Sequence, residues 1–330
     1  MDIKKALVFG GGGFIGSHMV KRLKSEGYFV RSVDLKYPEF SISPADEFLI
    51  HNLTEPENFN EILTYNYSET FDEIYQYAAD MGGAGFIFTG DNDAEIMTNS
   101  GLINMNLLKF QKQLNDKYDV NKTTIFYSSS ACIYPEYNQL DPENPICTEE
   151  SAYPAAPDSE YGWEKLFSER LYLSYNKNFN IPVRVARFHN IFGPEGTYDG
   201  GREKVPAAIC RKIAESKNGE IEIWGDGNQT RSFLFIDECI EATRRLMKSK
   251  LTIPVNIGSE EMVSINELVK IVSDVAKKEV VVKHIDGPLG VRGRNSDNTL
   301  IKSELGWDYE MTLKDGIYKT YNWINNRLNQ

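Results

Sequence analysis

A cluster of glycines near the N-terminus constrains the fold more than any other feature of this chain. Residues 5–9 form a short apolar run, as in a buried parallel strand, and residues 17–24 have helical periodicity. Gly10, Gly13 and Gly16 lie between them, at a spacing that allows a tight turn. Backbone N–H groups at the start of such a helix can bind a pyrophosphate. The pattern therefore predicts a dinucleotide-binding strand–turn–helix unit.

The carboxylate after the next apolar run indicates which dinucleotide is bound. Residues 28–33 lead into Asp34, eighteen residues beyond Gly16. An acidic side chain there suits the ribose hydroxyls of NAD and repels the 2′-phosphate of NADP. Lys36 weakens this preference without cancelling it. A glycine cluster alone is also typical of a flexible loop, but the strand–turn–helix–strand–aspartate order favours an NAD site.

Strand-like and helix-like runs alternate through the first half of the chain. Residues 74–79, 123–130 and 183–188 are predicted strands, and residues 94–115 are a predicted long helix. This alternation is typical of an α/β fold with a doubly wound parallel sheet, the Rossmann arrangement. Ligands of such sheets bind beyond the carboxyl ends of the strands, which predicts one crevice lined by residues 10–13, 79–83, 128–132 and 189–190.

After about residue 190 the predicted elements become shorter and glycine-containing turns become more frequent. Gly-Pro, Gly-Gly and Gly-Asp-Gly turns punctuate shorter elements there. We therefore expect an NAD-binding Rossmann domain over residues 1–189 and a smaller α/β substrate domain over residues 190–330. Apolar runs within residues 233–258 could also belong to the main sheet, so the sequence does not fix this domain boundary at a single residue.

A tyrosine and a lysine four residues apart suggest proton chemistry. If residues 160–170 are helical, the spacing places Tyr161 and Lys165 on one face. A nearby cation favours the phenolate and so lowers a tyrosine pKa from its ordinary value of about 10. Such a tyrosine can take a proton from a sugar hydroxyl while hydride leaves the same carbon. The alternative is chance spacing on an amphipathic helix, and the N-terminal NAD motif favours the catalytic interpretation.

Composition excludes several other classes of protein. Apolar residues make up 41% and charged residues 25% of the 330, as in ordinary soluble enzymes. A net charge of −12 disfavours nucleic acid or an anionic membrane as the main partner, although cations can gather locally around a small anion. No stretch has the length of a membrane span, and the chain runs straight into its first strand, so we expect no signal peptide and a cytoplasmic location. The four cysteines lack C-x-x-C spacing, so neither a metal site nor a disulfide framework is expected.

Together, the glycine spacing, Ser130 and Tyr161-x-x-x-Lys165 resemble the extended short-chain dehydrogenase/reductase family of NAD-dependent epimerases and dehydratases. The similarity extends over nearly the whole chain and is most specific to the branch that inverts GDP-mannose at carbons 3 and 5. It rests on residues 78–83, 129–135, 187–191, 200–204, 224–233 and 291–298. Two positions depart from the family pattern. Asn52 replaces an aspartate near the adenine, and Phe9 replaces a small residue before the glycines.

The resemblance implies a reaction and roles for five residues. Tyr161 would remove the proton from the carbon-4 hydroxyl, Ser130 would hydrogen-bond the developing ketone, and Lys165 would keep Tyr161 ionised. The transient ketone acidifies the hydrogens on carbons 3 and 5. Inverting those carbons needs a base on one face and an acid on the other, and Cys132 and Lys204 match this pair. Which of the two serves as base or acid at each carbon stays open.

Simpler interpretations of these residues exist. Cys132 could be a small buried hydrophobe, the commonest fate of a free cysteine. If the chain stays extended past Ser130, however, Ser130 and Cys132 share a face, and a nearby cation lowers a thiol pKa from about 8.5. Lys204 could be a surface charge, but the glycines at 200–201 suggest a backbone shaped around a ligand. His189 is interpreted as structural.

The resemblance also assigns binding residues. The expected NAD-binding residues are Gly10, Gly13, Phe14, Ile15, Gly16, Asp34, Lys36, Asn52, Ala78, Tyr161 and Lys165. The expected residues for the GDP-sugar are Gly82, Gly83, Ser130, Asn190, Glu203, Lys204, Lys212, Gln229, Arg292 and Arg294. Arginine suits bidentate contact with phosphate, although Arg292 and Arg294 could also form an exposed basic turn.

We therefore expect an NAD-dependent nucleotide-sugar epimerase that converts GDP-mannose to GDP-L-galactose and GDP-L-gulose through a 4-keto intermediate. The alternatives are a 4-epimerase or 4,6-dehydratase of another nucleotide sugar, a 3,5-epimerase of a different GDP-hexose or GDP-heptose, and a silent NAD-binding sensor. Dehydratases usually carry acidic residues just after the serine, where this chain has Ala131 and Cys132. A 4-epimerase has no use for Cys132 and Lys204. The resemblance also implies a homodimer.

Overall fold

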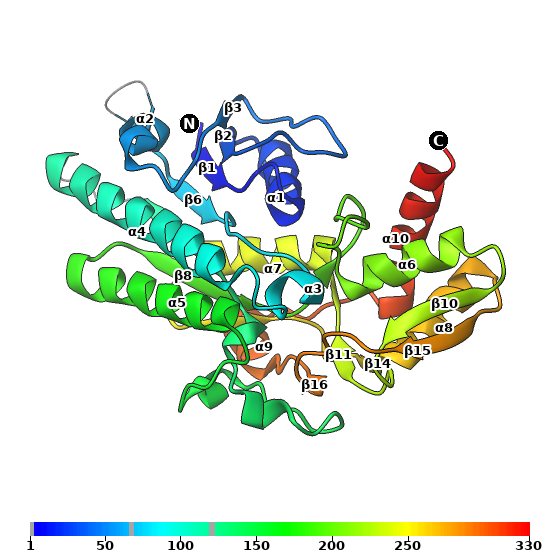
Figure 1. Ribbon diagram of the computed structural model, residues 1–330. Helices are drawn as coiled ribbons and strands as arrows, with labels where there is room; N and C mark the ends of the chain where they lie inside the picture. The colour runs from blue at the N-terminus through cyan, green and yellow to red at the C-terminus, as the bar shows by residue number, and fades with distance from the viewer. Residues whose placement is uncertain (1–2, 66–68, 119–122) are drawn as a thin grey trace.

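Seven parallel strands form the main sheet in the computed structural model, which describes residues 3–65, 69–118 and 123–330 (Figure 1). In spatial order they are β3 (Glu47–Ile50), β2 (Phe29–Asp34), β1 (Lys5–Phe9), β6 (Glu73–Gln76), β7 (Thr124–Ser130), β8 (Val183–Phe188) and β13 (Val255–Ile257). Leu7 lies opposite Arg31 of β2 and Ile74 of β6. This order confirms the predicted doubly wound fold, with β1 in the interior of the sheet between β2 and β6.

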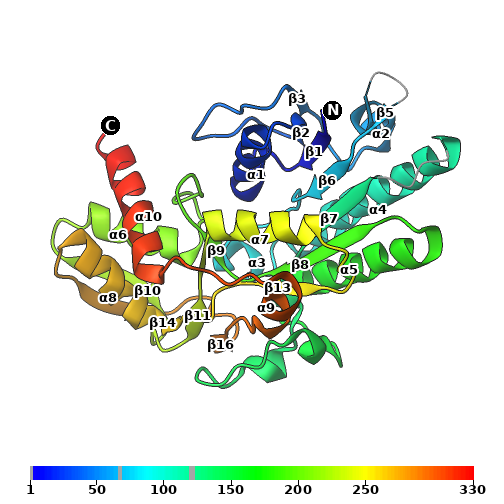
Figure 2. The ribbon, with the colours of Figure 1, turned by 180° about the vertical axis from the view of Figure 1, so that it is seen from behind.

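Helices cover both faces of this sheet (Figures 1 and 2). One face carries α1 (Phe14–Ser25) and α7 (Ile236–Lys248); the other carries α2 (Phe59–Leu63), α4 (Asp93–Tyr118) and α5 (Glu160–Phe179). Alternate residues of β1 enter different cores, because Ala6 and Val8 pack with α1 whereas Leu7 and Phe9 pack with α4. Burial on both faces explains why the four residues after Lys5, at 6–9, are all apolar.

A smaller unit completes the chain. Its helices are α6 (Val205–Glu215), α8 (Ile265–Ala276) and α10 (Leu313–Leu328). Its strands are β10 (Glu220–Trp224) paired with β15 (Val281–Ile285), and β11 (Thr230–Ser232) between β14 (Met262–Ser264) and β16 (Gly293–Arg294). The other short elements are α3 (Ala84–Ile87), α9 (Thr299–Leu305), β4 (Thr64–Tyr65), β5 (Glu69–Thr70), β9 (Ile191–Phe192) and β12 (Leu234–Phe235).

Two strands differ from the sequence prediction. The strand predicted at 74–79 ends at Gln76, because the Gln76 side chain accepts the N–H of Ala78 at 3.0 Å and donates to the carbonyl of Ala78 at 2.9 Å. The chain therefore turns at the carboxyl edge of the sheet instead of continuing along it. The edge strand β3 was not predicted; its four residues are only partly buried and carry no strong alternation.

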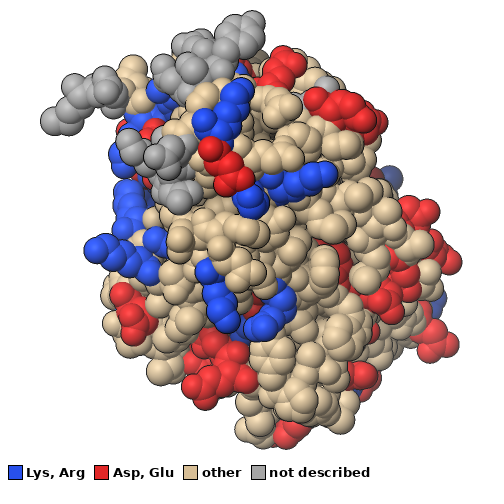
Figure 3. Space-filling view, turned by 90° about the vertical axis from the view of Figure 1, so that its left-hand side faces the viewer, with Lys and Arg blue, Asp and Glu red and all other residues tan. Residues whose placement is uncertain are grey.

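The net charge of −12 is not spread uniformly over the surface. On the face in Figure 3, lysine and arginine side chains occur among acidic ones and large uncharged areas. In the part of the chain that the structure describes, no helix combines the length and the apolar character needed to cross a membrane.

Candidate active site

The glycine-rich turn between β1 and α1 forms a close-fitting backbone cradle. Gly10 has a φ of +79°, and a Cβ there would lie 2.7 Å from the Ala78 nitrogen. A Cβ on Gly16 would lie 2.1 Å from the Gly10 carbonyl oxygen. Gly13 donates to that same carbonyl at 3.1 Å, which closes the turn directly before Phe14 begins α1. Side chains at Gly10 and Gly16 would collide with neighbouring backbone, so glycine is required for the tight turn that brings the first N–H groups of α1 to the end of β1. This is the turn that fits the pyrophosphate of a dinucleotide.

Asp34 ends β2 beside this cradle. Its carboxylate accepts the N–H of Gly12 at 2.9 Å and that of Leu35 at 2.7 Å, and burial raises the pKa of the carboxyl. Lys36 points away, with its ammonium 3.8 Å from the Glu39 carboxylate at the surface. The position of Asp34 beside the glycines is the one that ribose hydroxyls require.

The remaining residues predicted to bind the cofactor lie at two places. Phe14 and Ile15 are the first residues of α1 and are partly buried, and Ala78 follows β6 against Gly10. Asn52 lies in the turn after β3, where its side-chain oxygen accepts the N–H of Thr54 at 3.1 Å. Its amide nitrogen donates to the Glu55 carboxylate at 3.1 Å, so both ends of the Asn52 amide group hold its own turn.

Tyr161 and Lys165 occupy the first turns of α5, as predicted. Ser159 caps this helix by accepting the N–H of Gly162 at 3.2 Å. A Cβ on Gly162 would lie 2.3 Å from the carbonyl oxygen of Cys132, so glycine lets α5 approach the end of β7. The Lys165 ammonium donates to the carbonyl of Ser128 at 3.0 Å and lies 5.7 Å from the centre of the Tyr161 ring. The tyrosine–lysine pair therefore borders the carboxyl end of β7.

The predicted effect of Lys165 on Tyr161 was wrong for this structure. Burial raises the pKa of Tyr161 above its ordinary value of about 10, and Cys132 raises it further, against a hydrogen bond from Ser130. Burial also lowers the pKa of Lys165, opposed by Glu164 and Cys132. Desolvation disfavours both charged forms, so it outweighs the attraction of the neighbouring cation. The Tyr161 phenol is therefore protonated at neutral pH in this arrangement.

Cys132 lies beside Ser130, but not for the predicted reason. The chain does not stay extended; residues Ala131–Ile133 form a short 3₁₀ turn, η2, directly after β7. Ser130 instead accepts the backbone N–H of Cys132 at 3.2 Å and so begins that turn. Arg294 donates to the Cys132 sulfur at 3.1 Å. The hydroxyl of Ser130 and the thiol of Cys132 are thus neighbours through a turn, and a guanidinium contacts the thiol.

Two residues that the sequence did not single out hold Arg294 in this place. Gln139 accepts from the guanidinium at 2.6 Å and Asp158 accepts at 3.3 Å. Arg294 is 5% exposed, and its neighbours raise its pKa despite burial. Because a carboxylate and an amide hold the guanidinium of Arg294, its positive charge stays next to the Cys132 sulfur. The segments at 139 and 158 lie far from 294 in sequence, so no local signal pointed to this contact.

Lys204 stands at the start of α6 and faces the same region. Its ammonium makes no hydrogen bond or ion pair with any residue that the structure describes. Burial lowers the pKa of the amine, while Cys132 and Cys239 oppose this shift. The neighbouring Glu203 carboxylate accepts the N–H of Gly201 at 2.6 Å and an Arg211 N–H at 3.4 Å. Lys204 is therefore a partly desolvated amine near the thiol, and its ammonium group has no hydrogen-bond partner among the described residues.

Arg231 is a further cation that the sequence reasoning passed over. Its guanidinium donates to the carbonyls of Leu289 at 3.3 Å and Val291 at 2.6 Å. Burial lowers its pKa to about 9, and Arg294 contributes to that shift. Two guanidinium groups close together in a desolvated region favour an anionic ligand. The signal was present, because Arg231 lies within the segment 224–233 that carried the family resemblance.

The other predicted substrate residues fall into two groups. Asn190, which has a φ of +44°, donates to the Ser232 carbonyl at 2.8 Å, and Gln229 has a buried side-chain oxygen without a partner among the described residues. By contrast, Lys212 donates to the Glu222 carbonyl at 2.6 Å and Arg292 pairs with Asp226 at 3.1 Å on the surface. The structure therefore does not bring Lys212 and Arg292 to the thiol, although Arg292 and Arg294 are only two residues apart.

Gly82 and Gly83 precede α3 and line the gap between the two parts of the chain. A Cβ on Gly82 would lie 2.7 Å from Phe86, and one on Gly83 would lie 2.2 Å from the Glu203 carbonyl oxygen. His189 makes a 3.0 Å contact with the Asn256 amide oxygen, and burial lowers its pKa to about 3. A neutral, bonded and fully buried imidazole agrees with a structural role.

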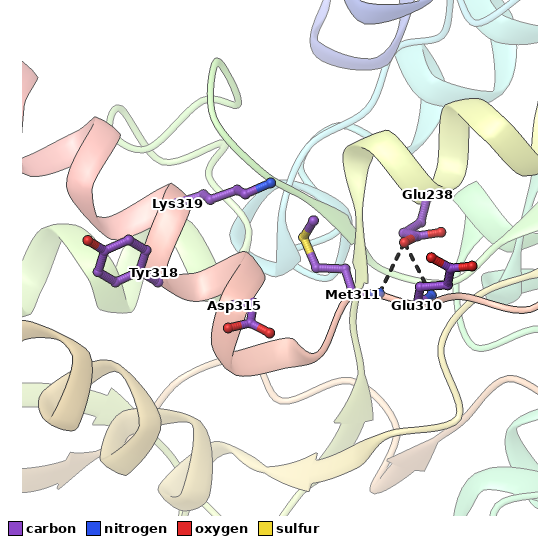
Figure 4. Close-up of a pocket in the computed structure, with 6 residues that line it drawn as sticks. All are labelled: Glu238, Glu310, Met311, Asp315, Tyr318 and Lys319. Atoms are coloured by element: carbon purple, nitrogen blue, oxygen red, sulfur yellow. Dashed lines mark hydrogen bonds between the residues drawn. The ribbon is translucent and has the colours of Figure 1, made fainter.

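A separate groove near α10 differs from the crevice in being lined by more acidic than basic side chains (Figure 4). It is lined by Glu238, Glu310, Met311, Asp315, Tyr318 and Lys319. The Glu238 carboxylate accepts the N–H groups of Glu310 and Met311, which fixes the chain entering α10. Three carboxylates against one lysine disfavour an anionic sugar nucleotide, so this groove does not compete with the crevice as its site.

Comparison with known proteins agrees with this geometry. The model of the NAD dependent epimerase/dehydratase family matches residues 6–258. A GDP-mannose 3,5-epimerase from Arabidopsis thaliana is 47% identical over 326 residues, which cover 98% of this chain and 83% of that protein. GDP-mannose 3,5-epimerase 1 from Oryza sativa subsp. indica is 48% identical over 323 residues, covering 97% and 82%.

Solved structures resemble the whole chain as well. A UDP-glucose 4-epimerase from Thermotoga maritima, with UDP-glucose, superposes with a TM-score of 0.81 at 25% identity and covers 98% of this chain and 99% of that one. A UDP-glucose 4-epimerase from Thermus thermophilus, in complex with NAD, has a TM-score of 0.80 at 21% identity and covers 97% and 98%, which supports the fold. With the glycine cradle, Asp34 and the tyrosine–lysine pair in place, the chain belongs to the NAD dependent epimerase/dehydratase family.

Proposed function

We propose that this protein epimerises GDP-mannose at carbons 3 and 5, giving GDP-L-galactose and GDP-L-gulose through a 4-keto intermediate. The observation that carries the proposal is the second pair of proton-transfer groups at the hydride site. Cys132 contacts Ser130 and Arg294, and the amine of Lys204 lies close enough to interact electrostatically with Cys132. The similarity to plant GDP-mannose 3,5-epimerases at 47% and 48% identity supports the same substrate.

The cofactor is NAD, and the residues around the cradle fit it. Gly10, Gly13 and Gly16 would hold the pyrophosphate with Phe14 and Ile15, and Asp34 would hold the ribose, with Lys36, Asn52 and Ala78 around the adenosine. When bound there, NAD would supply the reversible hydride chemistry at carbon 4 of the sugar, so no cofactor would be consumed.

The first proton transfer belongs to the residues at the end of β7 and the start of α5. Tyr161 takes the proton of the carbon-4 hydroxyl, while the Ser130 hydroxyl hydrogen-bonds the oxygen that becomes the ketone. Because burial keeps Tyr161 protonated in this structure, substrate and cofactor must lower its pKa before it can accept that proton. Lys165 lies 5.7 Å from the Tyr161 ring and provides the nearest cation for this shift.

The second pair acts on the acidified carbons beside the ketone. Cys132 on one side and Lys204 on the other remove and deliver a proton on opposite faces, which inverts the carbon. Arg294 holds the sulfur and balances the negative charge that develops there. Glu203, Asn190 and Gln229 would bind sugar hydroxyls, and Gly82 and Gly83 would lie beside the ring. Lys212 and Arg292 would bind the GDP end, together with Arg231.

Incubating the protein with GDP-mannose in heavy water, without added cofactor, tests this proposal. We expect deuterium at carbons 3 and 5 and products with the galactose and gulose configurations, measured by proton NMR and mass spectrometry. A folded, NAD-loaded protein that gives no exchange would exclude GDP-mannose as substrate. Conversion at carbon 4 alone would instead establish a 4-epimerase.

The assembly and surroundings of the protein are also proposals. Exposed apolar side chains on two neighbouring helices, Met97 and Met105 on α4 and Trp163 and Phe167 on α5, support a homodimer that uses this surface. We propose the domain division 1–189 and 190–330, with β13 and α7 assigned to the first domain, and action in the cytoplasm without nucleic acid or membrane. Light scattering on wild type and Phe167→Lys would test the dimer, because a new charge in an apolar interface should give monomers.

A further inference from the structure

The segment at 80–88 lies between the two groups that would invert carbons 3 and 5. On one side, Phe86 and Ile87 form an apolar cluster with Tyr161, and Cys132 packs against it. On the other side, the same segment contacts residues 201–203, directly before Lys204. We call residues 80–88 the spacer, because they contact the cluster beside the thiol on one side and the chain that leads into Lys204 on the other.

On the Lys204 side, the backbone at Gly83 packs directly against the backbone at residues 202–203. Gly83 donates its N–H to the Arg202 carbonyl at 3.0 Å. A Cβ on Gly83 would lie only 2.2 Å from the Glu203 carbonyl oxygen, so only glycine permits this approach. The two chain segments are thus in direct backbone contact immediately before the lysine.

The Arg202 side chain fastens this contact from outside. Its guanidinium lies 4.0 Å above the centre of the Phe86 ring and 3.7 Å from the Asp80 carboxylate. Asp80 is itself fixed, because its N–H is bound by the Ser100 hydroxyl at 3.0 Å and its carboxylate by the Asn99 amide at 3.2 Å. The Arg202 side chain is 56% exposed, but stacking on the ring and pairing with a held carboxylate restrict the positions that it can take.

The chain before Arg202 is held only through Glu203, whose carboxylate accepts the Gly201 N–H at 2.6 Å and an Arg211 N–H at 3.4 Å. Gly200 and Gly201 have φ angles of +86° and +84°, and a Cβ on either would meet nothing within 4 Å. Such glycines are conformationally free, so the position of residues 202–204 must come from contacts made after them. Lys204 has no side-chain partner that would hold its ammonium instead.

We propose that Arg202 is a positioning residue for Lys204: by clasping Phe86 and Asp80, it holds the start of α6 against the spacer and fixes the lysine opposite Cys132. This inference rests on the proposed function and adds a residue to it that touches neither sugar nor cofactor. A shift of about 1 Å in a proton-transfer group is enough to slow a reaction about 100-fold.

The test compares Arg202→Gln with Lys204→Met on GDP-mannose in heavy water. Lys204→Met identifies which carbon and which step, exchange or inversion, depends on the lysine. We expect Arg202→Gln to show the same pattern, reduced about 10- to 100-fold, with hydride transfer at carbon 4 within about threefold of wild type. Arg202→Lys keeps a cation near Phe86 and Asp80 and should recover most of the lost rate.

Controls separate positioning from simple loss of stability. Arg245→Gln removes an exposed arginine paired with Glu241 on α7 and serves as the matched control. Thermal unfolding is measured for each variant; if Arg202→Gln does not fold, Asp80→Asn weakens the same clasp and should give the same pattern with a smaller loss. Equal loss at both carbons and in hydride transfer, or no loss at all, would overturn the inference. Absence of exchange in wild type would overturn the proposed function, and the inference with it.

Discussion

The cofactor end and the reaction end of the crevice are built in different ways. The cofactor end comes mainly from one continuous stretch, residues 5–34, with Ala78 packed against it, and its shape depends mainly on backbone and on missing side chains. The reaction end combines side chains from separate segments, at 130–132, 161–165, 204 and 294. A dinucleotide cradle is therefore a local property of the sequence, whereas a proton-transfer pair depends on long-range packing.

The largest expected effect separates hydride transfer from cofactor binding. Tyr161→Phe removes the proton acceptor and should slow hydride transfer to NAD by about 10²- to 10⁴-fold, with NAD binding unchanged. The near-ultraviolet absorbance of NADH after mixing with GDP-mannose measures the rate. Tyr153→Phe, at an exposed tyrosine, is the control. A variant as fast as wild type would remove Tyr161 from the mechanism.

A substitution in the glycine cradle should instead weaken the binding of NAD. Gly16→Ala places a Cβ 2.1 Å from the Gly10 carbonyl oxygen, so the turn must shift. Overpacking of this kind costs about 1–3 kcal/mol, which predicts NAD binding weakened by about 10- to 100-fold in calorimetric titration of the cofactor-free protein. Gly101→Ala, in the middle of α4 with only an ordinary contact at 3.9 Å, is the matched control. Equal affinity in both variants would show that the cradle does not hold the pyrophosphate.

The smallest expected effect concerns a structural residue at the reaction end. Burial holds the pKa of His189 at about 3, below the ordinary value of about 6.5. Between these values the unfolded chain binds more protons, so the free energy of unfolding falls as pH decreases, by up to about 1.4 kcal/mol per pH unit. Denaturant unfolding at several pH values should show a shallower slope for His189→Asn, with His284→Asn as control. An unchanged slope would contradict the neutral, buried imidazole.

The sequence could predict most of the sheet and of the cofactor end. Apolar runs, glycine spacing and Asp34 are all local signals, and the i,i+4 spacing placed Tyr161 and Lys165 correctly on one helix face. The pattern failed at β3, where a short edge strand is only partly buried and lacks alternation. Local sequence also misjudged Tyr161, because its pKa depends on how completely other segments exclude water.

The reaction end was only partly predictable for the same reason. Cys132 and Lys204 were chosen by family resemblance, and the expected extended run after Ser130 is a 3₁₀ turn. The contact of Arg294 with Cys132 depends on Gln139 and Asp158, which no spacing rule connects. Arg231 was overlooked because its role depends on burial beside Arg294, a property of the folded chain.

The central claim is that inversion of carbons 3 and 5 is a separate function added to a hydride-transfer site. Cys132→Ala, mixed with GDP-mannose in heavy water, tests it most directly by measuring NADH absorbance and carbon inversion in the same sample. The account predicts hydride transfer at close to the wild-type rate and a loss of inversion of about 100-fold or more. Inversion at both carbons with wild-type rates would contradict it, because the thiol of Cys132 would then take no part in inverting either carbon.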